Sequence, residues 1–160
     1  MRLLLDTQVA LWWLGDSRRL SAATSELIAA SPCVVSVASV WEVAIKHRIG
    51  KLPVPPGRFR DEMRSAGATI LSVNDEHALA TLEHPADHFD PFDSLLLAVA
   101  RTEHLILMTA DAALLALARE LPLHHHLRRD AGVVGARQPQ RQEAAHAMPA
   151  DDDVHLRLVE

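Results

Sequence analysis

With 160 residues, 49% of them hydrophobic and 23% charged, the chain is long enough to bury a core and too apolar to be disordered throughout. Its single cysteine, Cys33, excludes an intrachain disulfide and a cysteine-rich zinc site, and we interpret it as a small core residue. No segment has the length of a membrane-spanning helix or the pattern of a signal peptide, which predicts a protein of the reducing cytoplasm with no membrane partner.

The formal charge of −5 argues at first against a nucleic-acid partner. Residues 1–120 hold 11 Lys and Arg against 15 Asp and Glu, and five of these acids form the group discussed below. Without those five, 11 basic residues face 10 acidic ones. If a divalent cation neutralises the group, the rest of the domain is close to neutral, and binding to a polyanion is no longer excluded.

Short apolar segments alternate with helical ones along residues 1–120. Strands are expected at residues 2–5, 33–37, 69–73 and 105–108. Helices are expected at residues 7–14, 21–30, 39–50, 57–66, 75–83 and 111–120, with another beginning at residue 90. Because the strands are continuously apolar, the pattern predicts an α/β fold with a parallel sheet covered on both faces. The order of the strands cannot be read from it.

The sequence changes character after residue 123. Residues 124–160 mix a histidine run, basic pairs and an acidic triplet without a sustained period. We therefore predict one domain over residues 1–123 and a loosely ordered tail over 124–160, in which 131–134 or 154–159 could add a strand.

Five carboxylates occupy unusual positions beside apolar segments. They are Asp6 after the run 3–5, Glu42 within 37–45, Asp90 and Asp93 before 95–100, and Asp111 after 105–110. Burying a lone carboxylate costs several kcal/mol unless another group offsets the charge. In an open parallel sheet, functional groups gather beyond the carboxyl ends of the strands, where Asp6 and Asp111 are expected. Together the acids indicate a shared cation.

Each acid also has an ordinary structural explanation. Asp6, Asp90 and Asp111 are suitable helix N-caps, and a carboxylate at the position of Asp93 favours the positive end of a helix dipole. Ser39 and Glu42 have the spacing of a capping box, and Glu42 can also pair with Lys46 one turn later. Capping explains Glu42 and Asp93 least well, because both have apolar neighbours on most sides.

Oxygen ligands favour Mg²⁺ or Mn²⁺, which keep several waters and need only two or three direct carboxylates. Such a site suits phosphodiester hydrolysis by a metal-activated water. Other candidate sites are weaker: the histidines (His84, His88 and 124–126) lack the usual zinc spacing or context, and neither a Gly-x-Ser-x-Gly element nor a glycine-rich phosphate loop occurs. The basic cluster Lys46, His47, Arg48 and Lys51 is either a solvated helix end or a phosphate contact.

Four segments, in this order, resemble the PIN-domain family, and specifically its VapC-type ribonuclease toxins. They are Leu3-Leu4-Leu5-Asp6-Thr7 with Trp12-Trp13-Leu14, Ser39 to Lys46 with Gly50-Lys51-Leu52-Pro53, Asp90-Pro91-Phe92-Asp93-Ser94 with the apolar run to Ala98, and Thr109-Ala110-Asp111. The combination is specific, although each piece alone is weak.

The resemblance implies a three-layer α/β/α sandwich with a central parallel sheet and an acidic pocket for Mg²⁺ or Mn²⁺. It implies that Asp6 and Asp93 are the primary metal ligands, that Glu42 and Asp111 complete the catalytic set, and that Asp90 supports it. It further implies RNA cleavage, homodimerisation and inhibition by an antitoxin protein.

The chain departs from the family pattern at Gln8, where relatives often have His, at Ser94, where they often have Arg, and in its long tail. The leading hypothesis is a metal-dependent endoribonuclease toxin, and the alternative is a catalytically weak or inactive PIN-like binding module. A phosphohydrolase with Asp6 as nucleophile ranks below both, because such enzymes place a second Asp at the position of Gln8. The RNA target cannot be read from the acids.

Overall fold

The computed structural model describes residues 1–83, 90–120 and 157–159. Its sheet contains β1 (Leu3–Leu5), β2 (Cys33–Ser36), β3 (Thr69–Leu71), β4 (Ile106–Thr109) and β5 (Arg157–Val159), in the order β3-β2-β1-β4-β5. The first four strands are parallel, as expected, and β5 pairs antiparallel with β4 at one edge. β5 falls within one of the two segments considered for an extra strand.

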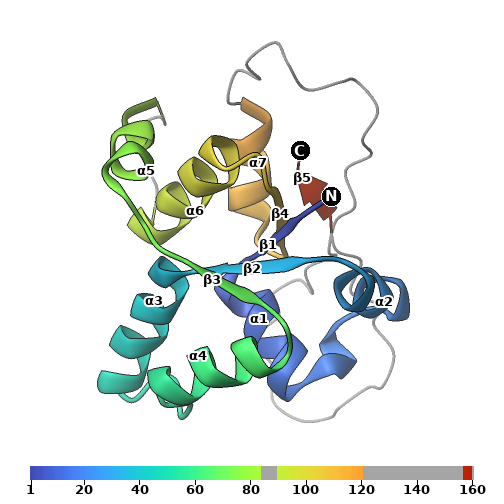
Figure 1. The fold of residues 1–160 in the computed structure, drawn as a ribbon. Coiled ribbons are helices and arrows are strands. Elements are labelled where there is room, and N and C mark those ends of the chain that lie inside the picture. The colour runs from blue at the N-terminus through green and yellow to red at the C-terminus, as the bar shows by residue number, and fades with distance from the viewer. Residues whose placement is uncertain (84–89, 121–156, 160) are drawn as a thin grey trace, which may run out of the picture.

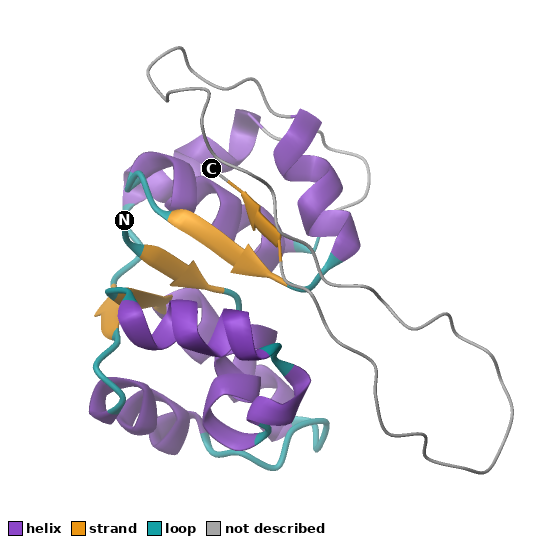
Figure 2. Ribbon diagram, turned by 90° about the vertical axis from the view of Figure 1, so that its right-hand side faces the viewer, coloured by secondary structure: helices purple, strands orange, loops and turns teal. Residues whose placement is uncertain are grey.

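Two helical layers enclose this sheet. The helices are α1 (Thr7–Gly15), α2 (Ala22–Ala30), α3 (Val37–Arg48), α4 (Pro56–Ser65), α5 (Asp75–Ala80), α6 (Pro91–Thr102) and α7 (Ala112–Glu120), with short 3₁₀ turns η1 (Ser17–Arg19) and η2 (Thr81–Glu83). Helices α1, α3 and α4 lie on one side of the sheet and α5, α6 and α7 on the other (Figure 1), and the turned view shows the strands between these layers (Figure 2). The predicted α/β/α sandwich is confirmed.

The central strands are mostly apolar because each face of the sheet has its own core, and the buried polar residues Ser36 and Thr109 stand at the ends of β2 and β4. Leu3 and Leu5 of β1 pack with Phe59 and Met63 of α4 on one face. Leu4, whose side chain points the opposite way, packs with residues of α6 and α7 on the other. A sheet covered on both faces favours apolar side chains at both faces of its strands, which explains the continuous apolar runs.

The beginning of α3 differs from the prediction. The helix starts at Val37, and its N-cap is Ser36, whose hydroxyl accepts a hydrogen bond from the Ala38 amide at 3.1 Å. The predicted capping box of Ser39 and Glu42 is therefore wrong. Ser36 and Ser39 are both residue types that cap helices, and a helix can begin only where the strand before it ends. The pairing of β2 with β3 extends to Ser36, so the helix begins directly after this residue.

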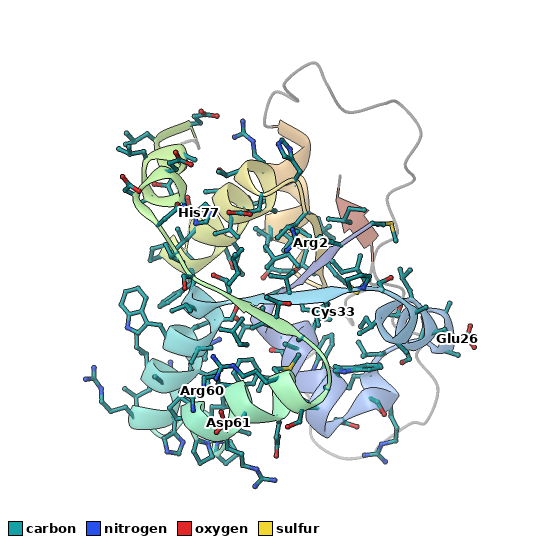
Figure 3. The ribbon with its side chains drawn as sticks, viewed as in Figure 1. Arg2, Glu26, Cys33, Arg60, Asp61 and His77 are labelled. Atoms are coloured by element: carbon teal, nitrogen blue, oxygen red, sulfur yellow. The ribbon has the colours of Figure 1, made fainter. Side chains whose placement is uncertain are left out.

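A capping box does occur at the start of α5. The Asn74 side chain accepts from the His77 amide at 2.9 Å, and His77 Nδ1 accepts from the Asn74 amide at 3.2 Å. The His77 side chain is completely buried, and its Nε2 lies 3.1 Å from Oε1 of Glu103 at the end of α6. His77 therefore joins α5 to α6 (Figure 3).

Several expectations concern residues outside the described ranges. These are the domain boundary at residue 123, the tail apart from β5, the alternative strand at 131–134, and the histidines at positions 84, 88 and 124–126. Among the residues that are described, no helix has the length and apolar character needed to cross a membrane.

Candidate functional site

The topology brings four chain segments to the carboxyl edge of the central strands. Asp6 directly follows β1, and Asp111 lies two residues beyond the end of β4, its neighbour in the sheet. Helix α3 leaves the same edge after β2, and α6 starts there because it runs back towards the beginning of β4. Acids far apart in the sequence thus share one edge, as expected for this type of sheet.

Asp6 is a buried carboxylate without a capping role. It occupies the N-cap position of α1, but its side chain makes no capping hydrogen bond there. Instead, Oδ2 accepts a hydrogen bond from the Thr109 hydroxyl at 2.7 Å, and only 7% of the residue is exposed. Burial raises the pKa of Asp6, the Thr109 hydrogen bond opposes this, and the charge of Glu42 adds to it. The N-cap explanation therefore does not account for this carboxylate.

Asp93 lies within reach of the charges of all the other acids in the group. It is the third residue of α6, as the sequence indicated. Burial is the largest cause that raises the pKa of Asp93 to about 7. Four other carboxylates add to this rise through their negative charges: Asp6, Asp90, Asp111 and Glu42. All five predicted acids are thus brought within electrostatic reach of one side chain.

Glu42 is held by two neighbours. Its Oε2 accepts a hydrogen bond from the Thr7 hydroxyl and its Oε1 one from Lys46 Nζ, each at 2.5 Å. The pairing with Lys46 that we considered as a structural explanation is therefore present. Burial opposes a higher pKa for Lys46, but its hydrogen bond to Glu42 and the charges of Glu42, Asp6 and Asp90 outweigh burial and raise it. Lys46 is thus a cation at the border of the acidic group.

Asp90 and Asp111 cap helices and also face the group. Asp90 accepts from the Phe92 amide at 2.8 Å, and Asp111 accepts from the amides of Ala113 and Leu114 at 2.7 and 3.2 Å. Both capping explanations are confirmed. Each carboxylate still raises the pKa of Asp93, so capping and membership of the acidic group coexist.

Thr7 and Thr109 were not predicted as site residues, whereas Lys46 was considered as a partner of Glu42 and as part of a basic cluster that could contact phosphate. Thr109 accepts from the Asp111 amide at 3.0 Å while donating to Asp6, so one hydroxyl orients both ends of the group. Thr7 and Thr109 stand next to or two residues from a predicted acid, but nothing in the sequence distinguishes them from ordinary polar residues at strand ends. The role of Thr109 depends on the adjacency of β1 and β4, and that of Thr7 on the packing of α1 against α3.

The chemistry of the donors fits a hard divalent cation. All five side chains offer oxygen, and the single positive charge of Lys46, which interacts with Glu42, Asp6 and Asp90, cannot neutralise five carboxylates. In the described part of the chain, however, no three His, Cys, Asp or Glu side chains stand close enough to form a finished metal cage. Glu42, Asp90 and Asp111 are directed to Thr7, Lys46 and backbone amides instead.

Cys33 has no place in this site. Its thiol is half-buried and donates to the carbonyl oxygens of Ile28 and Ser31, both at 3.4 Å. Burial raises the pKa of the Cys33 thiol, so it stays protonated and is a poor nucleophile.

Comparisons with known proteins point in one direction. The family model described as the PIN domain matches residues 3–120. Ribonuclease VapC16 of Mycobacterium tuberculosis is 45% identical over 47 residues, which are 28% of this chain and 33% of that protein. The chain therefore matches only about a third of this relative's length.

Two solved structures are similar to this chain at low sequence identity. VapBC2 of Rickettsia felis, bound to a DNA fragment from its promoter, has a TM-score of 0.56 and 13% identity, covering 73% of this chain and 93% of that one. A toxin–antitoxin complex from Klebsiella pneumoniae has a TM-score of 0.48 and 20% identity, covering 68% and 86%. At 13% identity, the likeness to VapBC2 concerns the fold alone.

Proposed function

Since this chain belongs to the PIN domain family, we propose that it is a metal-dependent endoribonuclease, the toxin of a toxin–antitoxin pair. The observation that supports this most is the electrostatic effect of four other carboxylates, Asp6, Glu42, Asp90 and Asp111, on Asp93. Acids without compensating charges at one edge of the sheet repel each other and lower the stability of the fold. Binding of a cation during function explains why the acids are placed there.

We assign the roles by residue type and position. Asp6 and Asp93 are the direct ligands of Mg²⁺ or Mn²⁺, Glu42 and Asp111 complete the catalytic set, and Asp90 supports it. The bound cation supplies the polarisation of the phosphate and the acidification of a water. Thr109 keeps Asp6 oriented, and Thr7 with Lys46 holds Glu42 at the border of the group.

The partners follow from the same proposal. RNA is the substrate, a cognate antitoxin protein is the inhibitor, and the toxin acts as a homodimer in the cytoplasm. The resemblance to VapC-type toxins and the partial match to Ribonuclease VapC16 support this part. Nothing in the acidic group selects a particular RNA sequence.

RNA cleavage by the purified chain tests the proposal. Cleavage should require Mg²⁺ or Mn²⁺ and stop in EDTA, and Asp6→Asn or Asp93→Asn should each reduce the rate by about 100-fold or more. The matched control is Asp61→Asn on α4, which removes an exposed carboxylate paired with Arg60 away from the site (Figure 3). If Asp6→Asn and Asp93→Asn cleave RNA as fast as Asp61→Asn, the nuclease proposal is wrong.

A catalytically weak or inactive PIN-like binding module is the second candidate. The observation that favours it is the engagement of Glu42 by Thr7 and Lys46, which leaves this acid partly neutralised. Titration with Mn²⁺ separates the two candidates. The nuclease should bind Mn²⁺ at a saturable site that Asp93→Asn abolishes, whereas the inactive module should show no such site.

A further inference from the structure

An exposed aromatic side chain borders the acidic group. Trp41 of α3 is 58% exposed, although tryptophan is usually well covered in folded proteins. Its ring packs against Phe92 of α6, with the ring centroids 4.9 Å apart and the planes tilted by 60°. This contact supports one side of the indole and leaves much of its surface open to solvent.

The aromatic pair and the acidic group share the same two helices. Trp41 precedes Glu42 on α3, and Phe92 precedes Asp93 on α6. Because the charge of Glu42 reaches Asp93, the ring contact and the acids belong to one junction between α3 and α6. A flat apolar surface therefore lies immediately beside the proposed place of phosphodiester cleavage.

Positive charge continues along the same face of α3. Arg48 follows Trp41 by seven residues, a spacing that returns to the same side of a helix about 10 Å further along its axis. Arg48 is exposed and makes no hydrogen bond or ion pair with any residue that the structure describes. Proteins that bind single-stranded nucleic acids combine an aromatic ring with a nearby guanidinium in this way. A base stacks on the ring, and a phosphate contacts the cation.

We propose that Trp41, supported by Phe92, is a stacking platform for an unpaired nucleobase of the RNA, next to the phosphate that is cleaved, and that Arg48 contacts a neighbouring phosphate. This inference rests on the proposed nuclease function and names a positioning residue for it. The stack places the chain of the RNA relative to Asp6 and Asp93 without reading base identity, since every base offers a flat surface.

Binding of single-stranded oligoadenylate of about 12 nucleotides in EDTA tests the stack without cleavage. Wild-type tryptophan fluorescence should be quenched on binding, and Trp41→Phe should lose that quenching because Trp12 and Trp13 of α1 are the only other indoles and are half-buried. Trp41→Ala should weaken binding by about 5- to 100-fold, and Trp41→Phe, which keeps a ring, by only about 3-fold.

A matched control removes an exposed apolar side chain elsewhere. Leu82 of η2 is 81% exposed, and Leu82→Ala should bind the oligonucleotide and cleave RNA as the wild type does. Arg48→Gln should reduce the salt dependence of binding by about one phosphate contact. Circular dichroism and light scattering on every variant test whether the fold and the oligomer size are retained.

The outcomes separate this inference from the nuclease proposal. If the wild type cleaves RNA but Trp41→Ala binds and cleaves equally well, the stacking platform is wrong and the nuclease proposal stands. If the wild type binds with quenching that Trp41→Phe loses but never cleaves, the nuclease proposal is wrong, and of the platform only base stacking stands, without a role in positioning for cleavage. If the wild type does not bind the oligonucleotide, or Trp41→Ala converts a dimer into monomers, the platform is wrong, and in the second case the exposed indole belongs to a contact between copies.

Discussion

The Thr109 hydroxyl lies 2.7 Å from Oδ2 of Asp6 and donates a hydrogen bond to it, although 103 positions separate the two residues in the sequence. The contact joins the carboxyl ends of β1 and β4, which are neighbours in the sheet. Because Thr109 also accepts from the Asp111 amide, it connects the buried acid of one strand to the acid that follows the other. Substitution of this threonine should therefore affect both.

Thr109→Val should destabilise the protein by roughly 1–3 kcal/mol, because valine has a similar shape but removes the hydroxyl hydrogen bonds to the buried Asp6 carboxylate and to the Asp111 amide. Urea unfolding at neutral pH measures the change. Thr109→Ser, which keeps the hydroxyl, is the control and should lose less. Equal stability of the valine and serine variants would contradict this role of the hydroxyl.

Asp93→Asn should stabilise the metal-free protein, by on the order of 1 kcal/mol, because it removes a half-buried charge that four other carboxylates repel. The same variant should lose the rise in melting temperature that Mn²⁺ gives the wild type. Thermal melts with Mn²⁺ and with EDTA measure both effects. If Asp93→Asn is less stable than the wild type in EDTA, the negative charge of Asp93 does not destabilise the metal-free protein.

The metal-free protein should become more stable as the pH falls from about 8 towards about 5. The pKa of Asp93 is about 7 in the folded protein, against an ordinary value of 3.8, and that of Asp6 is also raised. Between these values the folded protein binds protons that the unfolded chain does not, so protonation favours folding. Melting temperatures in EDTA across this range measure the effect, and Asp93→Asn should show a shallower dependence. Parallel curves for the two proteins would rule out Asp93 as the source.

Lys46→Gln should bind Mn²⁺ more tightly than the wild type, by about 2- to 10-fold, because it removes the cation that pairs with Glu42 and competes with a metal for the acidic group. Calorimetric titration measures the affinity. Lys51→Gln carries the same substitution at an exposed position outside the group and should leave the affinity unchanged. If Lys46→Gln and Lys51→Gln raise the affinity for Mn²⁺ by the same factor, the loss of long-range positive charge, and not the loss of the pair with Glu42, is responsible.

His77→Ala should cost about 2–4 kcal/mol of stability, since it empties a fully buried position and breaks both the capping box with Asn74 and the contact with Glu103. His47→Ala is the matched control, because His47 is exposed and has one contact, to the Leu52 carbonyl oxygen. Urea unfolding compares the two. A small effect at His77 would show that α5 is held to α6 by apolar packing alone.

Local features of the sequence were sufficient for much of the fold. Apolar runs of three or four residues predicted β1 to β4, and Ser21, Asp90 and Asp111 cap their helices because a short polar side chain satisfies amides two or three residues away. The start of α3 was predicted wrongly because Ser36 and Ser39 are both adequate caps. The pairing of β2 in the sheet, which extends to Ser36, decides between them.

The sequence by itself determined which residues are acids at the ends of apolar segments, and hence that the chain resembles a family with an acidic pocket. Only the tertiary structure decided how those acids are held. Asp6 turns from its helix end to Thr109, and Glu42 contacts Thr7, because strand order and helix packing place residues from distant segments within hydrogen-bonding range. No periodicity or spacing along the chain encodes such contacts, since they arise only when β1 lies between β2 and β4.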